Sequence, residues 1–163
     1  MISQSAQVIR KLICIVAVAG LAAGCSSAPE TRPAGAKRVS GALSTADQAV
    51  SVALQQVGAP YRYGGSSPAG FDCSGLVHYS YSRAGKSIPR TTATLWNSMQ
   101  PVAANQLQKG DVLFFRLAGK MSHVRMYIGG GRFVHAPSSG KMVSVASLGS
   151  DFYSDAFIRA GRP

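Results

Sequence analysis

The apolar positions between residues 46 and 57 recur every three or four residues. This spacing places them on one face of a helix. Either Ser44 or Thr45 can cap its first turn, with Gln48 three or four residues on as the partner of a capping box. Gly58 is suited to end this helix. The pattern therefore predicts an amphipathic first helix before a loop rich in Gly, Pro and Tyr.

A second helix is predicted from Cys73 to Ala84, because no proline interrupts this stretch. Asp72 can act as its N-cap, since a carboxylate accepts hydrogen bonds from the free N–H groups of a first turn. Gly85 is typical of the position that follows a helix. A short third helix is expected over residues 93–99. Trp96 in that helix is expected to be a core residue or to form the wall of a groove.

From Lys109 onwards the apolar pattern changes to a period of two, which indicates strands. Helices followed by a run of antiparallel strands predict an α+β fold. The expected strands cover residues 111–116, 124–129, 132–136, 143–145 and 157–160.

Gly129–Gly131 form the turn of a hairpin whose register decides where two histidines point. A three-residue loop, or an equivalent bulge, would pair His135 with Arg125 and place it on the same face as His123. We predict this register, because three glycines readily supply the positive φ angles that it requires. Arg125 would then lie beside His135. Its guanidinium would have to turn to solvent or find an acid, because burying an unpaired cation is costly.

Residues 1–24 have the pattern of a secretory signal, with two basic residues before an apolar segment of twelve residues that is too short to span a bilayer. Residues 21–25 resemble a bacterial lipobox, which implies cleavage before Cys25 and lipidation of its thiol. Ser26 follows this cysteine, at the position where an aspartate would signal retention in the inner membrane. The resemblance therefore implies anchoring at the outer membrane, on its periplasmic face. We therefore expect a lipidated flexible tether over residues 25–41 and a folded domain over residues 42–163.

The formal net charge of the chain is +11, and it falls to about +9 when the predicted signal peptide is removed. Such a charge favours anionic partners, namely nucleic acid, acidic lipid headgroups or the carboxylates of a cell-wall polymer. No run of Lys and Arg with interleaved aromatic residues is present, so a nucleic-acid partner is not expected.

Cys73 is the one cysteine left after Cys14 departs with the signal and Cys25 is lipidated, so no disulfide within the mature chain is expected. Its position in the first turn of a helix favours the thiolate, whereas the alternative is a small buried apolar residue. His123 opens a predicted strand and His135 lies in the partner strand. A cysteine facing a histidine base, with a third polar group to orient the base, is the arrangement for thiol acyl transfer.

His78 lies five residues after Cys73 on the predicted helix, which rotates it away from the thiol. We therefore expect a surface or packing role for it.

The chain resembles the NlpC family of bacterial cell-wall cysteine peptidases, a compact papain-like group. The resemblance extends from about Gln56 to Arg159 and rests on motifs in family order. These are residues 60–65 (PYRYGG), 71–77 (FDCSGLV), 89–91 (PRT), 110–115 (GDVLFF), 123–124 and 127–129 (HV, YIG), and 134–136 (VHA).

The resemblance implies that Cys73 is the nucleophile, His123 the base and His135 the residue that orients the base. Tyr61 matches a tyrosine whose hydroxyl lies near the nucleophile and helps to bind the oxyanion. The resemblance implies a compact papain-like fold. We expect no metal and no cofactor, and we expect the protein to be a monomer. Arg125 departs from the family pattern, which has Gly or Ala two residues after the base.

The other matching polar residues, Arg90 and Asp111, are expected to support a loop and the start of a strand. Lys109 replaces a proline that the family usually has before the Gly-Asp pair, which is a change at a turn.

The activity that the resemblance implies is hydrolysis of an amide bond in peptidoglycan, either after D-glutamate or in the peptide crosslink. Two alternatives stay open. Arg125 would support a non-catalytic lipoprotein that binds the cell wall, and the same thioester chemistry would also support an acyltransferase.

Overall fold

The computed structural model describes residues 43–117 and 119–163. The predicted signal peptide, Cys25 and the predicted tether lie outside the described residues. Within the described part of the chain, no helix has the length and apolar character needed to cross a bilayer.

Helix α1 (Thr45–Leu54) begins at Ser44, whose hydroxyl accepts a hydrogen bond from the N–H of Asp47 at 3.0 Å. Ser44 also donates to the carboxylate of Asp47, whereas Gln48 donates to the carbonyl of Leu43. The capping box predicted with Gln48 is therefore wrong, because the side chain of Asp47, and not that of Gln48, forms a hydrogen bond with the cap residue Ser44. The helix also ends one turn before Gly58.

Helix α2 (Cys73–Arg83) agrees closely with the prediction. Asp72 is its N-cap and accepts from the N–H of Gly75. Gly85 follows the C-cap with a φ of 81°, the left-handed conformation that glycine adopts without strain. Helix α3 (Thr92–Ser98) begins at Thr91, which forms a capping box with Thr94. A two-stranded ribbon, β1 (Ser66–Ser67) with β2 (Gly70–Phe71), precedes α2 and was not predicted.

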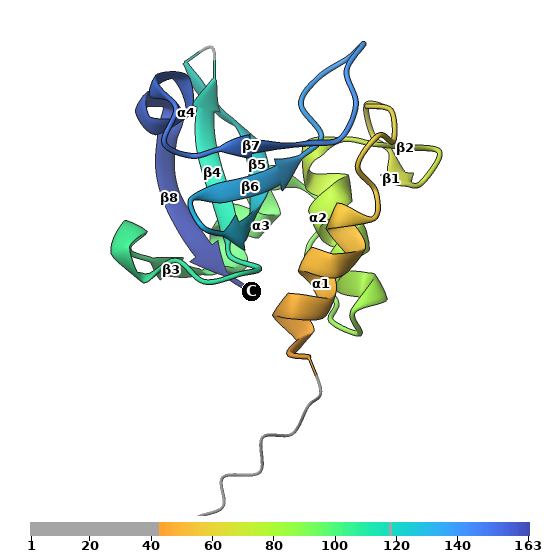
Figure 1. Ribbon diagram of the computed structural model, residues 1–163, viewed down its shortest axis with the longest axis horizontal. Coiled ribbons are helices and arrows are strands. Elements are labelled where there is room, and N and C mark those ends of the chain that lie inside the picture. Colours follow the sequence, from red (N-terminus) through yellow and green to blue (C-terminus); the bar gives the residue numbers. More distant parts are fainter. Residues whose placement is uncertain (1–42, 118) are drawn as a thin grey trace, which may run out of the picture. The chain divides into compact units, whose positions relative to one another are not determined.

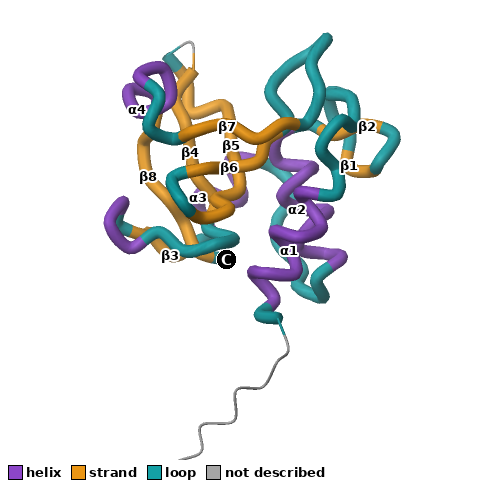
Figure 2. Tube along the Cα trace, viewed as in Figure 1, coloured by secondary structure: helices purple, strands orange, loops and turns teal. Residues whose placement is uncertain are grey.

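A six-stranded antiparallel sheet has the strand order β3-β8-β4-β5-β6-β7 (Figures 1 and 2). The predicted meander is present from β4 to β7, but the last strand returns to pair with the other edge of β4. The strands are β3 (Gln100–Val102), β4 (Val112–Leu117), β5 (Lys120–Gly129), β6 (Arg132–His135), β7 (Ser144–Ser147) and β8 (Phe157–Arg162).

The sheet has a hydrophobic core on each face. On one face, alternate residues of β4 to β6 pack against α1, α2 and α3. On the other face they pack against α4 (Asp151–Ala156) together with side chains of β8, the strand next to β4 in the same sheet (Figure 1). Residues 112–115 are therefore all fully buried, which explains their continuous apolar run. These helices and the antiparallel sheet confirm the α+β prediction.

The β5–β6 hairpin has the predicted register in its bulged form. Met126 pairs with Val134 and Tyr127 with Phe133, whereas Gly129 pairs with Arg132, so Ile128 is the extra residue of a bulge. All three turn glycines have positive φ angles.

This register brings Arg125 beside His135, as predicted, and its Nε lies 3.2 Å from His135 Nδ1. The expectation that the guanidinium turns to solvent or to an acid is wrong. Arg125 is only 3% exposed and stacks on aromatic rings, whose faces offer a cation partial compensation for lost water.

Candidate active site

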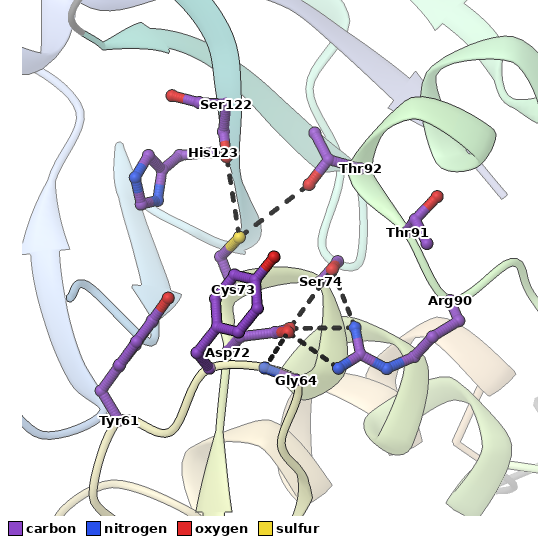
Figure 3. A pocket seen from close by; sticks show the side chains of 11 residues that line it. Tyr61, Gly64, Asp72, Cys73, Ser74, Arg90, Thr91, Thr92, Ser122 and His123 are labelled. Atoms are coloured by element: carbon purple, nitrogen blue, oxygen red, sulfur yellow. Dashed lines mark hydrogen bonds and ion pairs between the residues drawn. The ribbon is translucent and has the colours of Figure 1, made fainter. Parts of the chain in front are cut away.

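A pocket of about 600 Å³ opens where the first turn of α2, the loop after α1, the start of α3 and strand β5 meet (Figure 3). Cys73 lies at its base and is 8% exposed. The lining residues are Tyr61, Tyr63, Gly64, Asp72, Cys73, Ser74, Arg90, Thr91, Thr92, Ser122 and His123.

Asp72 anchors the start of α2 to two neighbouring segments. Its Oδ1 accepts the N–H of Gly75 at 2.7 Å, and its Oδ2 accepts the N–H of Gly64 at 3.0 Å. Arg90 forms a bidentate ion pair with the same carboxylate, at 2.9 Å and 2.8 Å. Arg90 also donates to Ser74 Oγ and to the carbonyl of Gly65. These contacts fix the position of the adjacent Cys73.

The electrostatics of this network favour a charged Asp72. Burial on its own would raise the pKa of the carboxyl group, but the hydrogen bonds from Arg90 and Gly75, the charge of Arg90 and the N–H of Gly64 outweigh it. The pKa of Asp72 is therefore below its ordinary value. Because Arg90 uses both terminal nitrogens within the network, its guanidinium is a support for the site, as the sequence predicted.

The Cys73 thiol points towards β5 and α3. Its Sγ lies 3.9 Å from the carbonyl oxygen of Ser122 and 3.9 Å from Thr92 Oγ1 (Figure 3). Cys73 is the free cysteine of the described residues. Among these residues, no cluster of three or more His, Cys, Asp or Glu side chains could hold a metal ion.

His123 lines the same pocket as Cys73 (Figure 3). It lies inside β5 rather than at the start of a strand, because β5 begins at Lys120, four residues before the predicted strand over residues 124–129. Burial, followed by the positive charge of Arg125, lowers the pKa of His123. The neutral imidazole, which is the form able to accept a proton, is thereby favoured.

His135 lies on β6 with 4% exposure. Its Nδ1 accepts a hydrogen bond from Arg125, and its Nε2 lies 3.4 Å from Ser144 Oγ. Within the described part of the chain, no hydrogen bond joins His135 to His123, so the orienting role remains a prediction. Burial, and then the charges of Arg125, His123 and Lys141, lower the pKa of His135 to about 4.

Tyr61 places its hydroxyl at the end of the pocket that holds Cys73 and His123 (Figure 3). Burial raises its pKa, and the nearby Cys73 and Asp72 raise it further. The phenol therefore stays protonated and can donate a hydrogen bond. His78, by contrast, bonds to the carbonyl of Ile88 at 2.8 Å and does not line this pocket.

The structure thus brings Cys73, His123 and Tyr61 into one pocket, with His135 and Arg125 deeper in the sheet. Thr92 and Ser122, the neighbours of the thiol, were not predicted. No sequence signal marks them, because both reach the sulfur only through the docking of α3 and β5 on α2.

The fold and the pocket define an α+β domain in which a thiol at a helix start faces an imidazole on a strand. Residues 58–162 match the NlpC/P60 family, and the chain therefore belongs to this family.

Named relatives agree with this assignment. The chain is 40% identical over 120 residues to murein DD-endopeptidase MepH of Escherichia coli (strain K12), covering 70% of this chain and 44% of that protein. It is 40% identical over 124 residues to gamma-DL-glutamyl hydrolase of Bacillus subtilis (strain 168), covering 73% of this chain and 30% of that protein. The chain therefore spans less than half the length of each of these relatives.

One solved structure consists of a single domain that this chain matches over its whole length. The crystal structure of the NlpC/p60 domain of peptidoglycan hydrolase SagA superposes with a TM-score of 0.63 at 33% sequence identity. The match covers 74% of this chain and 100% of that domain.

Proposed function

We propose that this chain is a cysteine peptidase that hydrolyses an amide bond in the peptides of peptidoglycan. The observation that carries the proposal is the meeting of the Cys73 thiol and the His123 imidazole in one open pocket. The relatives named as murein endopeptidase and peptidoglycan hydrolase support the same substrate class.

The proposed reaction has two stages. His123 takes the thiol proton, and Cys73 Sγ attacks the carbonyl carbon of the scissile amide. The Tyr61 hydroxyl and the free N–H groups at the start of α2 stabilise the oxyanion. Collapse breaks the C–N bond, the amine leaves with the proton from His123, and a thioester remains on Cys73. Water, activated by His123, then releases the acid and restores the thiol.

Two target bonds fit this chemistry. The names of the relatives include a DD-endopeptidase and a gamma-DL-glutamyl hydrolase, which correspond to the crosslink and to a bond of D-glutamate. The net charge of the chain is +11, which suits a polymer rich in carboxylates. We propose peptidoglycan peptides as the substrate, with either of these two bonds as the one that is cut.

Incubation of the full-length chain with defined muropeptides, followed by mass spectrometry, tests this function. Hydrolysis adds one water across a single amide bond, and the fragment masses identify which bond is cut. An added amine acceptor would instead be joined to the acyl fragment by an acyltransferase. Unchanged muropeptides that still bind the chain would contradict the peptidase and support the non-catalytic wall-binding protein.

We also propose that the mature chain is a lipoprotein anchored through Cys25 at the periplasmic face of the outer membrane. The motif at residues 21–25 and the short apolar segment before it support this proposal. The intact mass of membrane-extracted protein should lack residues 1–24 and include acyl chains. A Cys25→Ala variant should lose the lipid and remain unprocessed. A mature mass without acyl chains, or one that retains the first 24 residues, would contradict the anchor.

A further inference from the structure

Arg125 is a buried cation that lies deeper in the sheet than the pocket. Its guanidinium carbon lies 4.0 Å from the ring centroid of Phe115, 4.6 Å from that of Tyr153 and 5.1 Å from that of Phe133. We call these three rings the aromatic cage. They come from β4, α4 and β6, so only the folded sheet and the short helix after it bring them together.

Stability alone does not explain a cation at this position. No ion pair involves Arg125 among the described residues, and its Nη1 is buried without a hydrogen-bond partner there. The cage offsets part of the lost hydration. Apolar side chains of similar volume often replace buried ions without loss of stability. The contacts of the guanidinium therefore point to a functional role.

The Arg125 Nε–H donates a hydrogen bond to His135 Nδ1 at 3.2 Å, and this bond has a definite chemical consequence. Arginine is only a donor, so Nδ1 must offer its lone pair. The ring proton of His135 is then on Nε2, which faces Ser144 Oγ at 3.4 Å. Adding a second proton at Nδ1 would require this bond to break beside a fixed positive charge.

We propose that Arg125 is a positioning residue with two separable effects. Its Nε–H holds His135 as the neutral Nε2–H tautomer, and its buried charge, two residues from His123 on the same strand, extends the activity of the His123–Cys73 pair to more acidic pH. The inference concerns residues of the proposed peptidase site and rests on that function. Arg125 itself does not line the pocket.

The groups around His135 support this assignment. Arg125 and His123 face it from β5 and Lys141 from the loop before β7, and all three oppose its protonation. Ser144 on β7 contacts Nε2, and the Tyr153 ring on α4 lies with its centroid 6.0 Å away. Within residues 43–117 and 119–163, no carboxylate is among the groups that shift its protonation.

The same charge acts on His123, two residues along the strand. His123 must be neutral to take the thiol proton, so activity falls as the pH drops through its pKa. Burial and the Arg125 charge lower that pKa, which moves the acidic limb of the pH–rate profile down. Protonation of His135 at Nδ1 would break the Arg125 contact that holds its ring in place.

The first measurement separates the charge of Arg125 from its hydrogen bond. In the full-length chain, Arg125→Met removes both, whereas Arg125→Lys keeps the charge without the planar donor. The acidic limb should move up by about one pH unit in the Met variant and stay near its original position in the Lys variant. The position of the acidic limb is measured in two ways. One is the pH dependence of hydrolysis, and the other is the rate at which iodoacetamide alkylates Cys73, followed on the Cys73 peptide by mass spectrometry.

The second measurement observes the tautomer directly and needs no substrate. The chain has three histidines, so ¹⁵N-histidine NMR can be assigned by single substitutions. His135 should show a protonated Nε2 and a bare Nδ1 down to about pH 5. In Arg125→Met, His135 should take up a proton at higher pH. A wild-type His135 with its proton on Nδ1, or charged at about pH 6, would overturn the proposal even if no Arg125 variant folded.

Arg159→Met is the matched control. Arg159 also stacks on an aromatic ring, 3.8 Å from the centroid of Trp96, but it is on β8 and donates its hydrogen bond to the carbonyl of Trp96 instead of to a histidine. Its loss removes one positive charge and should leave the acidic limb unchanged. A similar shift in both variants would assign the effect to net charge and contradict a specific role for Arg125. If the tautomer is as expected but no muropeptide is cleaved, the proposed function fails and the arrangement of His135 stands.

Discussion

Replacing Cys73 with alanine should lower the rate of muropeptide hydrolysis by roughly 10⁴-fold or more. The reason is that the thioester route requires the sulfur, and no other cysteine lines the pocket. The side chain is small and is one of many in the core cluster, so the variant should fold. Product formation is followed by mass spectrometry, and folding by circular dichroism and thermal melting.

Cys73→Ser is a useful comparison for this result. It keeps a hydroxyl beside Ser122 and Thr92 in nearly the same volume, but an alcohol is a far weaker nucleophile at the same base. We expect both variants to bind muropeptides and neither to turn them over at a useful rate. Near-normal turnover by folded Cys73→Ala would contradict the cysteine-peptidase function.

Gly75→Ala should have the second large effect, on stability as well as activity. A Cβ at this position would lie 2.0 Å from the carbonyl oxygen of Gly65 and 3.0 Å from Arg90 Nη2 and Asp72 Oδ1. The Gly65 carbonyl cannot retreat freely, because it accepts hydrogen bonds from Arg90 and from the N–H of Asp72. The methyl group must therefore push apart the network that fixes the start of α2.

We expect Gly75→Ala to lower the free energy of unfolding by about 3 kcal/mol, although alanine is intrinsically the better helix former by about 1 kcal/mol. Activity should fall by about 10²-fold or more, because the thiol shifts relative to His123. Chemical denaturation measures the first effect and muropeptide hydrolysis the second.

Gly149→Ala is the control for this prediction. Its added Cβ would meet nothing closer than 3.8 Å, and Gly149 does not have a positive φ angle. A change within about 0.5 kcal/mol is expected, as for ordinary surface substitutions. If Gly75→Ala were as harmless as Gly149→Ala, the close approach of α2 to the Gly65 loop would not be needed for the site.

The helices around the candidate site could be predicted because their signals are local. Asp72 and Gly85 mark the two ends of α2 by chemistry that acts within a few residues, and both positions agree with the structure. The bulged hairpin register could be predicted too, since three consecutive glycines and the alternation of strand faces leave few solutions. The order of the motifs was sufficient to indicate the family.

Other elements gave no local signal. Helix α4 has only six residues and no side-chain cap, so on its own it would be marginal and it depends on packing against Phe115 and Phe133. Strand β3 contains Pro101, which argues against a strand until β3 is seen to be the edge of the sheet. The return of β8 to β4 is a long-range pairing that no window of sequence reports.

The sequence by itself determined which residues we propose for the chemistry, namely one thiol at a helix start and one histidine on a strand, and it also held the motifs that give the family. The tertiary structure alone decided how charge is arranged around them. Arg90 neutralises Asp72 across a loop, and Arg125 finds an aromatic cage and the lone pair of His135 instead of an acid. The physical reason is that the cost of a buried charge depends on every group within a few ångströms, and those groups come from segments far apart in the chain.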